Sequence, residues 1–293
     1  MVTFEEFYEK YYRLLFLIPL CLLFASLFFL VVFYAKNGDI MYKDVSLTGG
    51  LSATVYVNKE VDIIKVESFL KKEVDDVFVR ALFDSEEGSQ GILIESSELD
   101  SQRLQKLLEG YLSIKLDDKS YFVQETGSRL GDNFYKEMIK ALLIAFVLMS
   151  IVIFVAFRSF VPSLVVILSA FFDIIVTLAL IDLIGMKISS SGIAALILLI
   201  GYSVDTDILL TTRVLKRRAE SVLVERILSS IKTGLTMAGT TIVATIVGFF
   251  LTTSFVLQQM FLIISMGVIV DIFSTYTMNA GILRLYMKRK YHE

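Results

Sequence analysis

Two aspartates, Asp205 and Asp207, lie inside the run 199–210, which is otherwise apolar enough to cross a bilayer. An ionised Asp at the centre of a membrane helix costs about 2.5–3.5 kcal/mol on insertion scales, so such residues usually face a bundle interior or a wet path, where they handle ions or protons. Side chains two positions apart on a helix point about 200° away from each other. We therefore expect only one of the two to share a path with other acids, and the sequence leaves open which one titrates.

Two further acids, Asp173 and Asp271, lie near the middle of apolar segments of their own. At that depth they join Asp205 and Asp207 as proton-coupling candidates, with Asp205 expected to be the main one, helped by Asp173. Lys232, at the start of a later apolar run, is the candidate cation that would balance the charge. A structural role stays open for each acid, as a hydrogen-bonding or ion-pairing partner between helices.

The composition is that of a polytopic membrane protein. The 293 residues are 55% hydrophobic, the mean hydropathy is +0.69, and about 20 apolar residues suffice for a helix that spans the hydrocarbon. The single cysteine, Cys21, allows no intrachain disulfide. Six spans are predicted, at residues 14–35, 138–157, 161–184, 192–212, 233–253 and 259–283.

Basic residues in the short loops predict the orientation. Arg158, the cluster within 213–218 and the tail within 284–290 fall on one side, against a single Lys187 on the other. Because the basic side is normally cytoplasmic, we expect a multi-pass cell-membrane protein with both termini in the cytoplasm. The predicted parts are residues 1–35, the cytoplasmic N-terminus and first helix; 36–135, an extracytoplasmic domain; 136–284, helices 2–6; and 285–293, a cytoplasmic tail.

The large loop at 36–135 has the pattern of a folded α+β domain. Strand-like alternation at 51–57, 77–83, 91–95 and 120–125 is interrupted by helical spacing at 61–74 and 99–112. The order β-α-β-β-α-β indicates a ferredoxin-like split βαβ sheet, with a turn at 87–91 between the central strands. The predicted fold is thus a six-helix membrane protein with one ferredoxin-like domain between helices 1 and 2.

The chemistry of this loop points to contact rather than catalysis. It carries 12 Lys and Arg against 19 Asp and Glu, a balance that argues against nucleic-acid binding. We interpret its acids as a solvated face. The loop shows no metal-ligand spacing, no nucleophile–base pair and no glycine-rich phosphate loop, so we expect no enzyme activity, no cofactor and no metal.

Several short elements, taken in order, carry a family resemblance. They are Asp44 to Thr48 with Gly49 and Gly50, the turn 127–131, Phe172-Asp173, Gly201-Tyr202-Ser203, and Gly239-Thr240-Thr241. Around a single large loop, they resemble the F subunit of the SecDF protein-export accessory complex in its archaeal form. The bacterial motif G-Y-S-x-N-D-T is altered here, because Asp205 and Thr206 replace Asn-Asp and Asp207 follows. Lys232 stands one residue out of register with the family's intramembrane Arg.

The resemblance implies a function that needs no nucleotide. SecDF proteins use the proton-motive force to assist Sec-dependent translocation on a scaffold related to RND transporters, and one charge crossing 100 mV supplies about 2.3 kcal/mol. Such exporters need two pseudo-symmetric halves, so a SecD-like partner is implied, with the Sec channel, translocating preproteins and membrane lipid as further contacts. Two alternatives stay open: a half-size RND-like exporter of lipids or small molecules, and a structural subunit whose acids only hold helices together.

Overall fold

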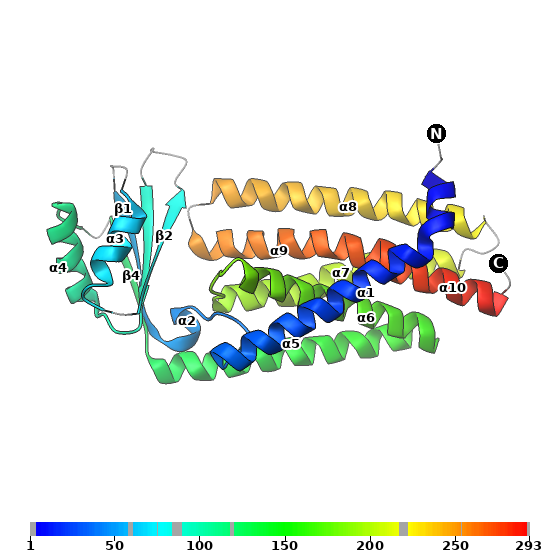
Figure 1. The fold of residues 1–293 in the computed structure, drawn as a ribbon, viewed down its shortest axis with the longest axis horizontal. Coiled ribbons are helices and arrows are strands. Elements are labelled where there is room, and N and C mark those ends of the chain that lie inside the picture. The colour runs from blue at the N-terminus through cyan, green and yellow to red at the C-terminus, as the bar shows by residue number, and fades with distance from the viewer. Residues whose placement is uncertain are drawn as a thin grey trace.

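The computed structural model describes residues 4–57, 61–74, 76–83, 90–117, 120–216, 222–252 and 254–291. A bundle of long helices carries a small sheet domain at one end, and both ends of the chain lie at the opposite end of the bundle (Figure 1). Six of the described helical segments are long and apolar enough to cross a membrane, which confirms the prediction of six spans.

Most of the observed helices extend beyond the predicted spans at one end or both, because their polar ends continue past the apolar stretch, whereas α6 agrees with its predicted span within one residue. They are α1 Phe4–Asn37, α5 Ser128–Phe157, α6 Phe160–Leu183, α7 Ser190–Lys216 and α8 Leu223–Leu251, followed by α9 Phe255–Phe273, the π-helix η1 Ser274–Asn279 and α10 Ala280–Tyr291, which run on without a break. The last three together form the sixth span.

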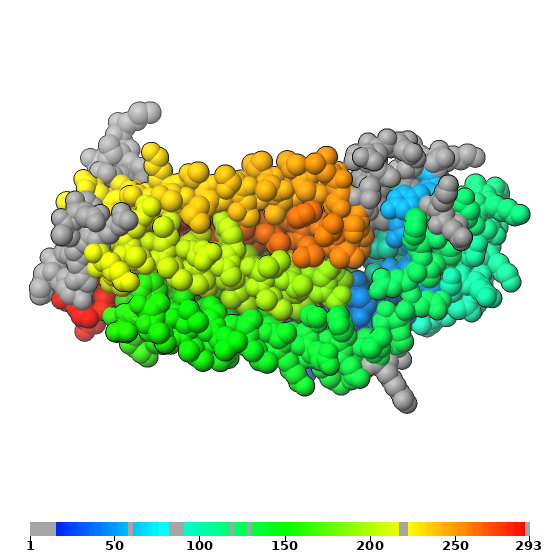
Figure 2. Space-filling model, turned by 180° about the vertical axis from the view of Figure 1, so that it is seen from behind, coloured from blue at the N-terminus to red at the C-terminus, as the bar shows by residue number. Residues whose placement is uncertain are grey.

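Helices α6 and α7 form the centre of the bundle. In their most apolar stretches 61% and 56% of the residues are buried, against 6% for α5. The side chains of α5 therefore face outward over most of its length, as expected for a lipid-facing helix. Figure 2 shows α7 on the surface between α5 and α8, so part of this central helix is uncovered.

The sheet domain has the predicted element order. Its elements are β1 Gly50–Val57, α3 Ile63–Leu70, β2 Val77–Phe83, β3 Gln90–Ser96, α4 Ser101–Leu112 and β4 Tyr121–Thr126. The strands lie in the order β2-β3-β1-β4, and every neighbouring pair is antiparallel. This is the predicted split βαβ sheet. The predicted turn at 87–91 falls largely on residues 84–89, outside the described part of the chain.

Alternating side chains give the sheet one covered face. Leu51, Ala53, Val55 and Val57 of β1 are buried, and they share a core with residues of α3 and α4 such as Val66 and Leu104. The alternate residues of β1 point to the face without helices. That second face turns toward the helix bundle, as the position of the sheet in Figure 1 shows.

Two aspartates begin the helices that cover the sheet. Asp62 accepts hydrogen bonds from the backbone N–H groups of Ile64 and Lys65 at the start of α3, and Asp100 accepts one from the N–H of Arg103 at 2.6 Å at the start of α4. Such side chains satisfy N–H groups that have no partner inside the helix. The N-cap also explains why α3 begins at Ile63 rather than at residue 61.

Glycines allow close approach where the first span meets the sheet. The short helix α2, Val45–Thr48, leads into Gly49 and Gly50, whose φ angles are +84° and +133°. A Cβ at Gly50 would lie 2.6 Å from the carbonyl oxygen of Ser96, and one at Gly131 would lie 2.5 Å from the backbone N of Gly49. Only glycine fits these positions. The fold thus brings together two of the elements that carried the family resemblance, 44–50 and 127–131.

Candidate functional site

Three aspartates converge in the interior of the bundle. Asp173 on α6, Asp207 on α7 and Asp271 on α9 are 0%, 0% and 1% exposed. Side-chain hydroxyl groups connect them, and most of these come from α7 and η1. The three acids thus form one site, which we call the carboxylate cluster.

Asp173 has a hydrogen-bond donor at each carboxylate oxygen. The hydroxyl group of Ser203 on α7 donates to Oδ2 at 2.5 Å, and that of Ser274 on η1 donates to Oδ1 at 2.6 Å. Ser203 belongs to the Gly-Tyr-Ser element that carried the family resemblance. That element therefore supplies a contact between α7 and α6.

Asp207 and Asp271 are joined by one hydroxyl group. Thr275 Oγ1 lies 2.8 Å from Asp207 Oδ1 and 3.1 Å from Asp271 Oδ1. Thr206 donates to Asp271 Oδ2 at 2.9 Å, and the side-chain amide of Asn279 donates to Asp207 Oδ1 at 2.6 Å. A hydroxyl group between two carboxylates can accept a proton from one and donate its own to the other.

The neighbours of the cluster are neutral. Within the described residues, no Lys, Arg or His side chain lies within ion-pair distance of any of the three carboxylates. Like charges in a low-dielectric interior repel strongly, and hydroxyl groups supply no balancing charge. In the described part of the chain, the three carboxylates are therefore held by hydrogen bonds from neutral groups rather than by ion pairs.

The π-helix η1 places three of these polar side chains. Ser274, Thr275 and Asn279 are each 0% exposed and belong to the six-residue η1 segment. A π-helix carries more residues per turn than an α-helix, and single turns of it occur frequently at functional sites. Here it turns Ser274 toward Asp173, and Thr275 and Asn279 toward Asp207.

The structure brings Asp207, rather than Asp205, to Asp173 and Asp271. Asp205 is exposed on the opposite side of α7, as the helical rotation of about 200° between them requires. The expectation that Asp205 shares a path with Asp173 inside this chain was therefore wrong in its geometry. Lys232 is also exposed, on α8, and forms no ion pair with Asp205 in the described part of the chain.

The other residues of the resemblance divide between interior and surface. Ser203 is buried and Tyr202 is half-buried, whereas Gly201, Gly239 and Thr240 are exposed, and Thr241 is partly exposed. The exposed members lie on α7 and α8, the two helices that also carry Asp205 and Lys232. We call the exposed side of these two helices, which carries Asp205 and Lys232, the α7–α8 face.

Sequence reasoning missed the polar side chains of η1. Asp271, Thr275 and Asn279 are four positions apart and Ser274 lies between them, so the four share one helix face in an otherwise apolar span. That spacing was the available signal. Asp182, near the end of α6, is a further buried acid: it is 4% exposed and accepts a hydrogen bond from the backbone N–H of Tyr42 at 3.2 Å.

Comparison with known proteins decides the family. The profile described as "Protein export membrane protein SecD/SecF, C-terminal" matches residues 109–289. The chain is 36% identical over 281 residues to the protein-export membrane protein SecF of Methanolacinia petrolearia, covering 93% of both chains. The chain belongs to the SecF family. A second SecF, from Methanocaldococcus jannaschii, is also 36% identical, over 95% of this chain and 96% of its own.

The fold agrees with this family. The crystal structure of SecDF from Thermus thermophilus, a translocon-associated membrane protein, superposes with a TM-score of 0.73 at 22% identity. The match covers 96% of this chain but only 38% of that one. SecDF in a form called super-membrane-facing matches with a TM-score of 0.59 over 94% of this chain. The SecF chain therefore corresponds in fold to one part of a longer SecDF chain.

Proposed function

We propose that this chain is the F subunit of a SecD–SecF complex that uses the proton-motive force to assist Sec-dependent protein translocation. Asp173, Asp207 and Asp271 carry the coupling protons. The observation that supports this most directly is the carboxylate cluster itself, in which three buried acids within the membrane spans are joined by hydroxyl groups. None of the described Lys, Arg or His side chains lies within ion-pair distance of these acids. Buried ionisable groups of this kind are the usual mark of a proton path.

The hydrogen bonds suggest how a proton could move. Thr275 bridges Asp207 and Asp271, so a proton arriving at one carboxylate reaches the other through a hydroxyl group already in place. Ser274 contacts Asp173 and the backbone carbonyl oxygen of Asp271. A shift of η1 relative to α6 and α7 would change these contacts together, which links the proton content of the cluster to helix position.

The α7–α8 face is where the SecD partner fits. Asp205 and Lys232 are exposed on the surfaces of membrane helices, and charged side chains in spans are stable against a protein partner or a wet cavity but not against lipid. The match to 38% of a SecDF chain leaves room for a second half. Asp205 thus serves at the junction of the two halves, where the partner supplies its counter-charge.

The direction of coupling follows from the proposed orientation. With both termini in the cytoplasm, the sheet domain lies outside, at the end of the bundle where protons would enter. A proton carried through 100 mV releases about 2.3 kcal/mol, enough to change the population of two helix arrangements by about fifty-fold. The sheet domain would pass that movement to a preprotein leaving the Sec channel.

The test uses the SecD–SecF complex in membrane vesicles with a Sec channel. Asp207→Asn keeps the size and hydrogen bonding of the side chain but removes the titrating group, so gradient-dependent stimulation of translocation should fall to background while assembly with SecD is kept. Glu225→Gln, at the exposed start of α8, is the matched control and should keep full stimulation.

The alternatives predict other results. A purely structural subunit would lose SecD binding in the Asp207→Asn variant, and loss of assembly together with loss of stimulation would favour that role. If the chain instead exports lipids or small molecules, membranes that lack it should translocate preproteins at the normal rate. Full stimulation by Asp173→Asn, Asp207→Asn and Asp271→Asn alike would contradict proton coupling through the cluster.

A further inference from the structure

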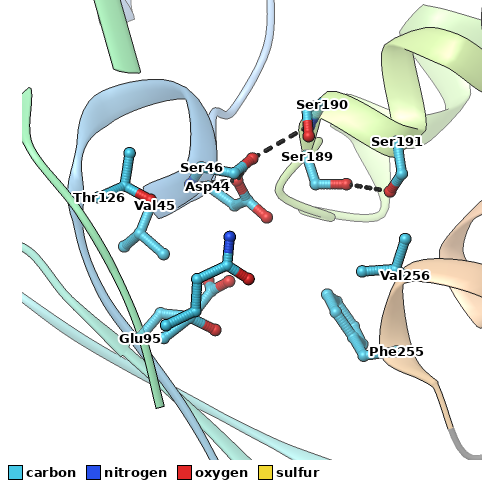
Figure 3. Close-up of a pocket in the computed structure, with 12 residues that line it drawn as sticks. Asp44, Val45, Ser46, Glu95, Thr126, Ser189, Ser190, Ser191, Phe255 and Val256 are labelled. Carbon is cyan, nitrogen blue, oxygen red and sulfur yellow. Dashed lines mark hydrogen bonds between the residues drawn. The ribbon is translucent and has the colours of Figure 1, made fainter. Parts of the chain in front are cut away.

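A second group of acids lies outside the membrane spans, where the sheet domain meets the bundle. Figure 3 shows Asp44 and Glu95 on two sides of a polar cavity that is also bordered by Ser189, Ser190 and Phe255. The cavity has a volume of about 80 Å³. Its walls come from the helix-free face of the sheet, from α2 and from the starts of α7 and α9, so it lies between the two parts of the molecule.

Glu95 belongs to the sheet. It is 2% exposed, lies opposite Ser52 of β1 and Phe78 of β2, and points to the face without helices. Its nearest cation is Lys187 in the loop between α6 and α7, with 4.0 Å between Nζ and Oε2. A buried sheet carboxylate thus meets a partly exposed lysine from a loop of the bundle.

Asp44 belongs to the bundle side. Its backbone N–H donates to the carbonyl oxygen of Ile188 at 3.0 Å, and its carboxylate accepts hydrogen bonds from the N–H and hydroxyl groups of Ser46. Ser46 in turn accepts a hydrogen bond from the N–H of Ser190 at the start of α7. Asp44 is therefore held by α2 and α7, while Glu95 arrives on β3.

We propose that Asp44 and Glu95 form a second proton-binding site where the sheet domain packs against the bundle, and that loss of its proton weakens this packing. We call the packed arrangement the seated form and the separated one the lifted form. Two buried carboxylates from opposite sides of the junction repel when both are ionised, and a proton on either removes that repulsion. The proposal concerns the junction alone and does not depend on proton coupling through the carboxylate cluster.

The charges around Glu95 set the direction of the effect. Burial and the neighbouring Asp44 raise the pKa of Glu95 from 4.5 to about 7, and Asp76 acts in the same direction. Lys187 and Arg80 oppose this rise in the Glu95 pKa. Apart from Asp44 and Glu95, the described residues that line the cavity are uncharged, among them Ser52 and Gln124 of the sheet, Ser189 and Ser190 by α7, and Phe255 and Val256 of α9.

The direction of the pH dependence follows from the linkage between proton binding and the seated form. When the sheet domain lifts, Glu95 meets water and its pKa returns toward 4.5, so the seated form binds the proton more tightly than the lifted form. Seating is then strongest below pH 4.5 and weakens as the pH rises to about 7. Each pH unit between 4.5 and about 7 changes the ratio of seated to lifted form by up to tenfold, which amounts to about 300-fold over the whole range.

The test measures the distance between the two parts in the full chain in lipid nanodiscs, without any gradient. Spin labels are placed at Lys106→Cys on α4 and Ile184→Cys after α6, both exposed positions, in a Cys21→Ser background. Pulsed electron paramagnetic resonance at pH 5.5 should give one narrow distribution of distances between the two labels. A second population at a longer distance should appear by pH 8.5. An unchanged distribution between these pH values would overturn the proposal.

Variants test whether the change in distance arises from Glu95 or from a general effect of pH on the protein. Glu95→Gln imitates the protonated acid and should keep the short distance at both pH values, whereas Glu98→Gln, which removes an exposed carboxylate three residues away, should respond like the parent. Lys187→Met removes the cation that opposes protonation, so the midpoint should move to higher pH. A pH response that survives Glu95→Gln, or a midpoint that falls in Lys187→Met, would contradict the assignment.

Discussion

Ser203 of α7 donates its hydroxyl hydrogen to Asp173 of α6 at 2.5 Å, with both side chains fully buried. This contact ties the Gly-Tyr-Ser element to the carboxylate cluster across the two central helices. It also gives that element a physical role, because Ser203 and Ser274 each donate a hydrogen bond to one oxygen of this buried carboxylate.

Replacing Ser203 tests that contact. Ser203→Ala removes one of two donors to Asp173, and a hydrogen bond to a charged group contributes about 1.5–3 kcal/mol. We expect a lower melting temperature and reduced gradient-dependent stimulation of translocation. Ser150→Ala is the control, because Ser150 bonds to the carbonyl oxygen of Phe146 within its own helix α5. Equal behaviour of the two variants would show that the contact is dispensable.

Thr275 offers a second test of the cluster. Thr275→Val keeps the shape of the side chain but removes the hydroxyl group between Asp207 and Asp271. If that hydroxyl group relays protons, stimulation should fall at least tenfold, and Thr275→Ser should restore it. Translocation assays with a fixed pH gradient measure this, with Thr277→Val as control, because the hydroxyl group of Thr277 bonds to the carbonyl oxygen of Phe273 in the same helix. A Thr275→Val complex with normal stimulation would exclude the relay.

Gly50 is a backbone requirement rather than a functional group. Its φ of +133° is strained for any residue with a side chain, and an added Cβ would meet the carbonyl oxygen of Ser96 at 2.6 Å. Gly50→Ala should destabilise the sheet domain by about 2–4 kcal/mol. Limited proteolysis of the full chain should show faster cleavage within 50–126, while Gly110→Ala, which has open space around it, should behave as the parent.

Most of the fold could be predicted from the sequence, because the patterns that define its helices and strands are local. Apolar runs define the spans, and alternation in stretches such as 51–57 defines strands with one buried face. The site was only partly readable. Four acids could be placed at membrane depth, but the choice between Asp205 and Asp207 depends on the rotation of α7, which tertiary packing sets.

The junction acids were misjudged for a related reason. The acids of the loop were interpreted as a solvated face, which fits Glu98 and Asp100, both exposed. Asp44 and Glu95 are instead 5% and 2% exposed, because the helix-free face of the sheet is pressed against the bundle. No local pattern indicates that contact, since the residues that cover Glu95 come from distant parts of the chain.

The orientation can be tested by labelling in whole cells. In a Cys21→Ser background, Lys106→Cys on α4 should react with an impermeant maleimide, whereas Lys288→Cys on α10 should react only after the membrane is opened. Both positions are exposed, so a difference reports the side of the membrane rather than burial. Labelling of position 288 in intact cells would reverse the proposed topology.

The last prediction concerns the α7–α8 face. If SecD covers Asp205, a cysteine at that position, Asp205→Cys, should crosslink to SecD with a short bifunctional reagent in the assembled complex. Val147→Cys is the matched control, because Val147 is 55% exposed on the lipid-facing helix α5 and should give no SecD adduct. Asp205→Leu leaves the counter-charge of the partner unpaired, so it should weaken assembly with SecD. Crosslinking at position 147 but not at position 205 would place SecD on the other side of the bundle.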